Sequence, residues 1–131
     1  MSERQKHVVL IDNDEKLLRN KTAILAKAGF RCSQINTSIV REKGVIPEIE
    51  TIQASGDQID LVLTDFHAIN DLDSTDYSGF RIAMALKEMK QNTVIFSSED
   101  HADLTQKYGV IFLSKMLEES EFIQQVNNLI K

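Results

Sequence analysis

Apolar residues along the chain gather into two kinds of segment that alternate. Short, continuous apolar runs are typical of parallel strands covered on both faces, and they occupy residues 7–11, 59–64, 93–96 and 110–113, with a weaker run over 30–35. Longer segments carry apolar residues at helical spacing over 15–28, 79–90 and 120–130, and a short polar helix is expected over 100–108. This strand–helix alternation predicts an α/β fold, a parallel sheet with helices on both faces, because right-handed crossovers leave few other topologies.

Residues 37–58 are the least defined part of this pattern. Thr37 or Ser38 is expected to cap a helix there, and Pro47 is expected to break that helix or to start a new one. Boundaries elsewhere are clearer. Gly29 fits the left-handed position after a helix end, and Ser120 is expected to cap the last helix.

Polar side chains stand at the carboxyl ends of the expected strands, where open α/β sheets bind their ligands. They are Asp12, Asn13 and Asp14 after the first strand, Asp65 after the third, Ser97 and Ser98 at the fourth, and Lys115 after the fifth. Carboxylates placed close together raise one another's pKa unless a cation neutralises them. Mg²⁺ takes one or two carboxylates together with water and phosphate oxygens. The pattern therefore predicts one shared acidic site for a hard divalent ion.

Such a site has a definite chemistry. A carboxylate beside Mg²⁺ can attack phosphorus and form an aspartyl phosphate, whose oxygens a lysine and the metal neutralise and a hydroxyl can bond. Each residue alone also has an ordinary structural interpretation. Asp14 is as well placed to be a helix N-cap as a ligand, Asp65 could cap a loop, and Lys115 could be a surface amine. Their joint placement at successive strand ends favours the site.

Composition narrows the class of protein. The length of 131 residues and the 42% hydrophobic content suit one domain over residues 1–131. A net charge of −5 and a pI of about 5.2 argue against a nucleic-acid-binding surface and against an anionic membrane surface. No apolar run approaches the roughly 20 residues of a membrane span, and the N-terminus lacks the apolar region of a secretory signal. With a single cysteine, Cys32, the chain suits a reducing cytoplasm.

Four stretches together resemble the receiver domain of bacterial two-component response regulators. VLIDNDE is similar to the family's acidic first-strand motif, and LVLTDF to the strand that presents the phosphoacceptor aspartate. VIFSS and FLSK are similar to the strands that end in a hydroxyl and in a lysine. The resemblance covers essentially the whole chain. It implies a five-stranded parallel sheet of strand order 2-1-3-4-5, flanked by five helices.

The resemblance also implies roles for particular residues. Asp65 would accept a phosphoryl group from the phosphohistidine of a histidine kinase or of a histidine phosphotransfer domain. Mg²⁺ or Mn²⁺ would be held by Asp12, Asn13, Asp65 and the main-chain carbonyl of His67.

Three further residues are expected to read the phosphoryl group and pass the signal on. Lys115 would be the phosphate-binding amine, Ser97 the switch hydroxyl, and Phe112 the aromatic switch residue that turns inward on phosphorylation. The output would then be a changed surface that binds a partner protein, with no nucleic acid or membrane bound by this domain.

The chain departs from the family pattern at three places. Asn13 stands where a second carboxylate is usual, which should lower Mg²⁺ affinity. Met116 replaces a cis-proline, whose non-proline equivalent costs about 2.5–4 kcal/mol. The loop after Asp65 is longer than usual, with additional acids at 71, 73 and 76 and Ser78-Gly79 where Asp-Gly is common.

These departures leave two alternatives open. One is a degenerate receiver that binds partners without being phosphorylated. The other is a haloacid-dehalogenase-like phosphatase with Asp12 as nucleophile, because Asp12 and Asp14 have that family's Asp-x-Asp spacing. Against the phosphatase stand Glu15-Lys16, where a Gly-Thr type pair is usual, and the absence of a role for Asp65.

Overall fold

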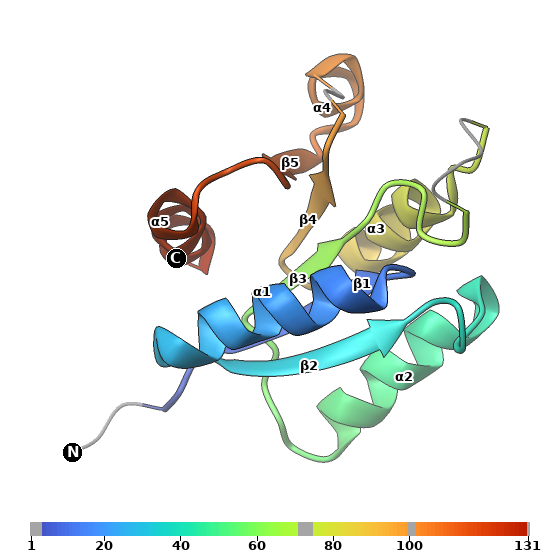
Figure 1. The fold of residues 1–131 in the computed structure, drawn as a ribbon. Coiled ribbons are helices and arrows are strands. Elements are labelled where there is room, and N and C mark those ends of the chain that lie inside the picture. Colours follow the sequence, from blue (N-terminus) through green and yellow to red (C-terminus); the bar gives the residue numbers. More distant parts are fainter. Residues whose placement is uncertain (1–3, 71–74, 100–101, 131) are drawn as a thin grey trace.

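The structure, a computed structural model, describes residues 4–70, 75–99 and 102–130. Strands and helices alternate along the chain as the apolar pattern predicts (Figure 1). The elements are β1 (His7–Asp12), α1 (Glu15–Lys27), β2 (Arg31–Asn36), α2 (Glu42–Ala54), β3 (Leu61–Thr64), α3 (Ser78–Glu88), β4 (Thr93–Ser97), α4 (Ala102–Tyr108), β5 (Ile111–Ser114) and α5 (Glu119–Ile130).

The strands form one parallel sheet in the order β2-β1-β3-β4-β5, which confirms the expected fold class and strand order. This order places β1 and β3 side by side in the interior of the sheet, where each has a neighbouring strand on both sides. In a parallel sheet the carboxyl ends of all strands meet at one edge, so this topology alone brings the predicted polar residues to the same side of the molecule.

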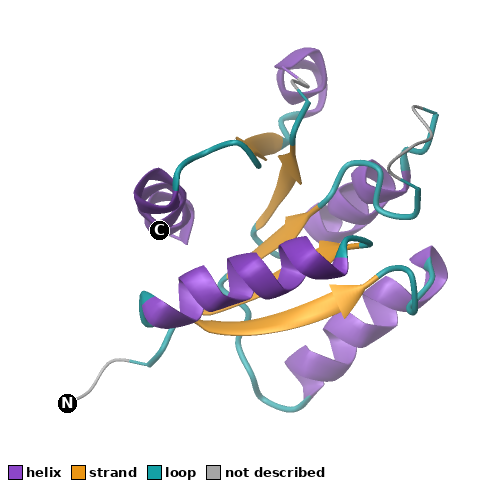
Figure 2. Cartoon of the chain, in the orientation of Figure 1, coloured by secondary structure: helices purple, strands orange, loops and turns teal. Residues whose placement is uncertain are grey.

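Helices lie on both faces of the sheet (Figure 2). Alternate residues of the central strands pack in opposite layers. Val8 and Leu10 pack in the layer of α1 and α5, in a cluster with Leu18, Leu25, Phe122 and Val126. Val9 and Ile11 pack in the layer of α2 and α3, in a cluster with Val45, Ile49, Ile82 and Leu86. Because both faces of β1 are covered, the strand reads as a continuous apolar run instead of an alternating one.

Helix α2 corrects the prediction that Pro47 would break or restart a helix. Pro47 lies inside α2, at a position that costs about 3 kcal/mol relative to alanine. Val45 and Ile49 on either side of it are fully buried, and burying two such side chains stabilises by about 1.5–3 kcal/mol each. Tertiary burial therefore outweighs the unfavourable helix propensity.

The predicted caps at Thr37 and Ser38 are also wrong. The residue before α2 is Arg41, whose side chain makes no capping bond. The Thr37 hydroxyl donates to the carbonyl of Ala68, and the Ser38 hydroxyl bonds the Asn36 side chain. These hydroxyls tie down the β2–α2 loop instead.

The last helix begins before the cap that was predicted for it. Ser120 lies inside α5, which starts at Glu119, and the Phe122 N–H donates to the Glu118 carbonyl at 2.8 Å. Within the described ranges, none of the helices combines the length and the apolar character needed to cross a membrane.

Candidate functional site

The carboxyl ends of four strands bring acidic, hydroxyl and amine side chains to one edge of the sheet. Asp12 is the last residue of β1, Asp65 follows β3, Ser97 ends β4 and Lys115 follows β5. The Asp65 N–H donates to the Ile11 carbonyl at 2.9 Å, which holds Asp65 next to the end of β1. The structure therefore brings together, from each of these four strands, a strand-end residue that the sequence singled out.

Lys115 links the two acids of the site. Its Nζ lies 2.8 Å from Asp12 Oδ2 and 2.8 Å from Asp65 Oδ1. Both carboxylates are buried, with Asp12 1% and Asp65 3% exposed. Two carboxylates this close to an amine, in a region of low dielectric, form a strongly interacting ion cluster.

The pKa shifts in this cluster have separate causes. Burial, and after it the charge of Asp65, raise the pKa of Asp12, although Lys115 lowers it in part. Burial by itself would lower the pKa of Lys115, but the charges of Asp12 and Asp65 outweigh burial and the net shift is upward. The amine therefore stays protonated. The lysine is the built-in counter-ion of the two acids.

Ser97 completes the side of the site that faces β5. It is buried, its Oγ accepts from the Glu99 N–H at 3.1 Å, and its carbonyl accepts from the Lys115 N–H at 2.9 Å. A cavity of about 220 Å³ opens here, lined by Asp14, Leu17, Asp65, His67, Ser97, Ser98, Glu99 and Lys115. The cavity is large enough for a phosphoryl group and several waters, a water occupying about 30 Å³ of liquid volume.

The His67 side chain braces the loops that border this cavity. Its Nε2 lies 2.9 Å from Glu99 Oε1, and its Nδ1 lies 2.7 Å from the Asp76 carbonyl oxygen. Burial lowers the pKa of His67, but the contacts to Asp76 and Glu99 outweigh it and the net shift is upward. The β3–α3 and β4–α4 loops are thereby joined across the mouth of the site.

Asn13 presents a neutral oxygen next to Asp12. Its Nδ2 donates to the Ile69 carbonyl at 3.2 Å, while its Oδ1 is buried and has no hydrogen-bond partner among the described residues. Asp14 lines the rim of the cavity but is exposed, and its side chain caps α1 by accepting from the Leu17 N–H at 3.2 Å.

The donor set fits a hard cation, although it is sparse. Within the described ranges no three His, Cys, Asp or Glu side chains cluster tightly enough to hold a metal ion. The site offers the carboxylates of Asp12 and Asp65 and the buried amide oxygen of Asn13, all of them oxygens, as Mg²⁺ prefers. The additional ligand expected from the His67 main-chain carbonyl stays a prediction.

No protein-family model matches the chain, and no curated protein matches it in sequence. Solved structures do match it. The chain has the receiver fold. A response regulator from Thermotoga maritima superposes with a TM-score of 0.72 at 16% identity, over 97% of this chain and 98% of the other. A CheY-like receiver domain from Methanospirillum hungatei gives 0.73 at 13% identity, over 97% and 94%. A receiver protein from Sinorhizobium medicae gives 0.68 at 22% identity, over 98% and 97%.

Two positions of the receiver fold can now be placed. Phe112 pairs with Ile95 in the sheet and is half-buried against Phe66, Ala83 and Val110, so an inward turn would bring it deeper into an existing apolar cluster. Met116 is 78% exposed, and no peptide bond among the described residues is cis, so the Lys115–Met116 bond is trans. The switch role of Phe112 stays a prediction.

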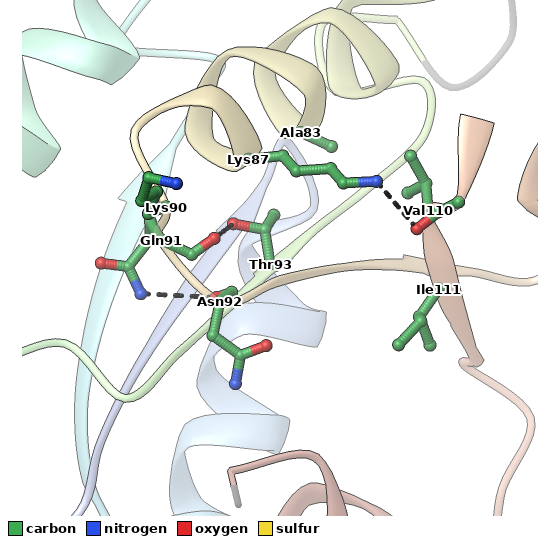
Figure 3. A pocket seen from close by; sticks show the side chains of 9 residues that line it. Ala83, Lys87, Lys90, Gln91, Asn92, Thr93, Val110 and Ile111 are labelled. Carbon is green, nitrogen blue, oxygen red and sulfur yellow. Dashed lines mark hydrogen bonds between the residues drawn. The ribbon is translucent and has the colours of Figure 1, made fainter.

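A second cavity, of about 290 Å³, lies at the amino-terminal ends of β4 and β5 (Figure 3). Its wall includes Lys87, whose Nζ donates to the carbonyls of Tyr108 and Gly109 at 3.0 and 3.1 Å. The Thr93 hydroxyl donates to the Gln91 carbonyl at 2.8 Å. Carboxylates are absent from its described lining, so its chemistry differs from that of the strand-end site.

Sequence reasoning missed two contributors to the site, Asp76 and Glu99. The sequence marks Asp76 only as one of the additional acids of this loop. In the structure its carboxylate accepts from the N–H groups of Ile69, Asn70 and Ser78 at 3.0, 2.7 and 2.9 Å. The available signal was its place two residues before Ser78, because an Asp side chain in a turn commonly accepts from the N–H two residues further on. The other two loop acids, at 71 and 73, lie outside the described residues.

Proposed function

We propose that the chain is a phosphoacceptor receiver in which Asp65 takes a phosphoryl group from the phosphohistidine of a kinase or phosphotransfer domain. The observation that carries this proposal is the Lys115 ammonium, which lies 2.8 Å from both Asp12 and Asp65 in a buried strand-end site. A fixed positive charge beside a carboxylate nucleophile is what a developing phosphoryl group needs.

The transfer is a displacement at phosphorus. An Asp65 carboxylate oxygen forms the new O–P bond as the P–N bond to the donor imidazole breaks. The electron pair of that bond stays on the imidazole nitrogen, and a proton on the other ring nitrogen leaves the donor ring neutral. Lys115 then exchanges part of its contact with Asp65 for a phosphoryl oxygen.

A divalent cation held by Asp12, Asn13, Asp65 and the His67 carbonyl would offset the negative charge of the phosphoryl oxygens. With one carboxylate fewer than the family pattern, this site would bind the cation more weakly. Cytoplasmic signalling through a partner protein, with Mg²⁺ or Mn²⁺ as the ion, belongs to the same proposal.

The signal would travel through Ser97. Its hydroxyl lies at the end of β4 in the same cavity as Asp65, so it can hydrogen-bond a phosphoryl oxygen. Movement of Ser97 would leave room for Phe112 to pack inward and would change the surface around β5. Such a change is a local charge event that biases a two-state element.

A degenerate receiver is the second candidate, because Asn13 leaves the site two carboxylates, which Lys115 already bridges. A phosphatase with Asp12 as nucleophile is a third. In that candidate Asp65 would be only a neighbour of the reacting group.

One experiment separates these candidates. The protein is incubated with phosphoramidate, with and without Mg²⁺, and read by intact mass as wild type, Asp65→Ala, Asp12→Ala, Asn13→Asp and, as a control at the opposite end of the sheet, Asp57→Ala. The proposal expects a phosphoryl adduct that requires Mg²⁺, survives in Asp57→Ala and disappears in Asp65→Ala. An adduct lost in Asp12→Ala but kept in Asp65→Ala would indicate the phosphatase. An adduct in Asn13→Asp alone would indicate a degenerate receiver.

A further inference from the structure

The Asn13 amide is oriented by the loop that follows β3. Its Nδ2 lies 3.2 Å from the Ile69 carbonyl oxygen, which can only accept a hydrogen bond. The reverse orientation would set two oxygens against each other at the same distance, so the amide nitrogen must face the loop. The amide oxygen must then face away from the loop, where it is buried without a hydrogen-bond partner among the described residues.

The Ile69–Asn70 peptide unit is held from its other side by Asp76. The Asn70 N–H belongs to the same planar unit as the Ile69 carbonyl, and it donates to Asp76 Oδ2 at 2.7 Å. In a trans peptide the N–H and the C=O point in opposite directions, so Asp76 binds the N–H side of the unit and Asn13 binds its C=O side.

Asp76 is itself firmly placed. Its Oδ2 also accepts from the Ile69 N–H at 3.0 Å, and its Oδ1 accepts from the Ser78 N–H at 2.9 Å at the start of α3. Its main-chain carbonyl lies 2.7 Å from His67 Nδ1. Burial would raise the pKa of Asp76, but the hydrogen bonds from Ser78, Asn70 and Ile69 lower it, so the carboxylate is ionised and accepts at both oxygens.

We infer that Asp76 is a positioning residue: through the Ile69–Asn70 peptide it sets the Asn13 amide so that the oxygen is available to a hard divalent cation beside Asp12 and Asp65. This inference rests on the proposed function for the identity of the cation. Asn13 is then a neutral ligand matched to this loop. An aspartate at position 13 would turn a carboxylate oxygen toward the Ile69 carbonyl, which this loop disfavours.

A double-mutant cycle between Asp76→Asn and Asn13→Ala tests the inference. Asparagine at position 76 keeps the size of the side chain, but its NH₂ group meets N–H donors, which loosens the peptide. The matched control is Asp60→Asn, which replaces a buried, hydrogen-bonded acid at the opposite end of the sheet. Each variant is measured for urea unfolding of the metal-free protein and for Mn²⁺ binding by electron paramagnetic resonance.

In the metal-free protein we expect the losses in free energy of unfolding from Asp76→Asn and Asn13→Ala to be non-additive. Each substitution breaks the same relay, the chain of hydrogen bonds from Asp76 through the Ile69–Asn70 peptide to Asn13. The losses from Asp60→Asn and Asn13→Ala should add. We expect Mn²⁺ binding to weaken about tenfold in Asn13→Ala and severalfold in Asp76→Asn, with no further weakening in the double variant. Additive stabilities would overturn the relay, whether or not Asp65 is phosphorylated.

Two other outcomes also decide against the inference. If Asp76→Asn weakens Mn²⁺ binding equally with and without Asn13, Asp76 does not act through Asn13. If the stabilities are coupled but neither wild type nor any variant binds Mn²⁺, the ligand role of Asn13 is wrong, and the metal requirement of the proposed function fails with it. Phosphorylation of Asp65 that needs no metal would then be the remaining test of the receiver function.

Discussion

Replacing Gly79 by alanine should damage the protein far more than an ordinary glycine-to-alanine change in a helix. Gly79 is the second residue of α3, and its N–H donates to the Phe66 carbonyl at 2.9 Å. A methyl group on its Cα would overlap the Asp65 carbonyl oxygen and lie 2.6 Å from the Phe66 carbonyl oxygen. Both obstacles are backbone atoms, so no side-chain rotation relieves them.

The expected loss in the free energy of unfolding of Gly79→Ala is the sum of three contributions. Overpacking costs about 1–3 kcal/mol, and a clash with two backbone oxygens belongs at the upper end. Loss of the hydrogen bond to Phe66 adds about 1 kcal/mol. The better helix propensity of alanine returns at most about 1 kcal/mol. The free energy of unfolding of Gly79→Ala should therefore fall by about 3 kcal/mol.

Gly44→Ala is the matched control, since Gly44 also lies in the first turn of a helix. A methyl group there would meet only Val40 Cγ1 at 3.0 Å, the end of a side chain that can move. This variant should stay within about 1 kcal/mol of wild type. Urea unfolding followed by far-ultraviolet circular dichroism suits the measurement, because the chain has no tryptophan.

The reasoning would be refuted if the two variants were equally stable. A close approach of α3 to the Asp65 backbone would then be wrong. Phosphorylation by phosphoramidate gives a second readout, because the clash must displace the backbone of the acceptor, and a shift of about 1 Å in a reacting group can cost about a hundredfold in rate.

Three further outcomes are expected. Lys115→Met should lower the free energy of unfolding near neutral pH by about 3–5 kcal/mol, since it leaves two buried carboxylates without their counter-ion; unchanged stability in urea unfolding would contradict the ion cluster. The hydrogen bond from Arg4 lowers the pKa of Asp60, so the contribution of Asp60 to stability should be complete above about pH 4 and disappear as the pH falls through the lower folded-state pKa. In Asp60→Asn the free energy of unfolding should therefore fall less steeply between neutral and acid pH, and an unchanged pH dependence would rule this out. Burial raises the pKa of Cys32 from 9.0 to about 11, so iodoacetamide should modify the native thiol about a hundredfold more slowly than the urea-unfolded one at pH 8, and equal rates would argue against burial.

Much of the fold was predictable because parallel strands buried on both faces leave a strong mark. Val8, Val9, Leu10 and Ile11 read as one apolar run, since successive side chains enter different core layers. Region 37–58 was harder. Proline disfavours a helix interior, but the burial of Val45 and Ile49 outweighs that preference and keeps Pro47 within α2.

Some features of the candidate site could also be predicted from the sequence, and others could not. Asp12, Asp65, Ser97 and Lys115 could be predicted as neighbours, because the carboxyl ends of parallel strands meet at one edge whatever the loops do. The bonds from the Ile69 and Asn70 N–H groups to Asp76, and the contact of Glu99 with His67, could not be predicted. These contacts are made by loops, whose course depends on three-dimensional closure and not on a sequence period.

The sequence by itself determined the alternation of elements, the buried strands and the set of polar residues at their ends, since these follow from periodicity and strand direction. Only the tertiary structure decided that Lys115 bridges Asp12 and Asp65, and that the Asn13 amide turns its oxygen away from the β3–α3 loop. The physical reason is range. Periodicity acts between near neighbours, whereas these contacts join residues about fifty to a hundred positions apart, and hydrogen-bond direction settles them only once the loops are in place.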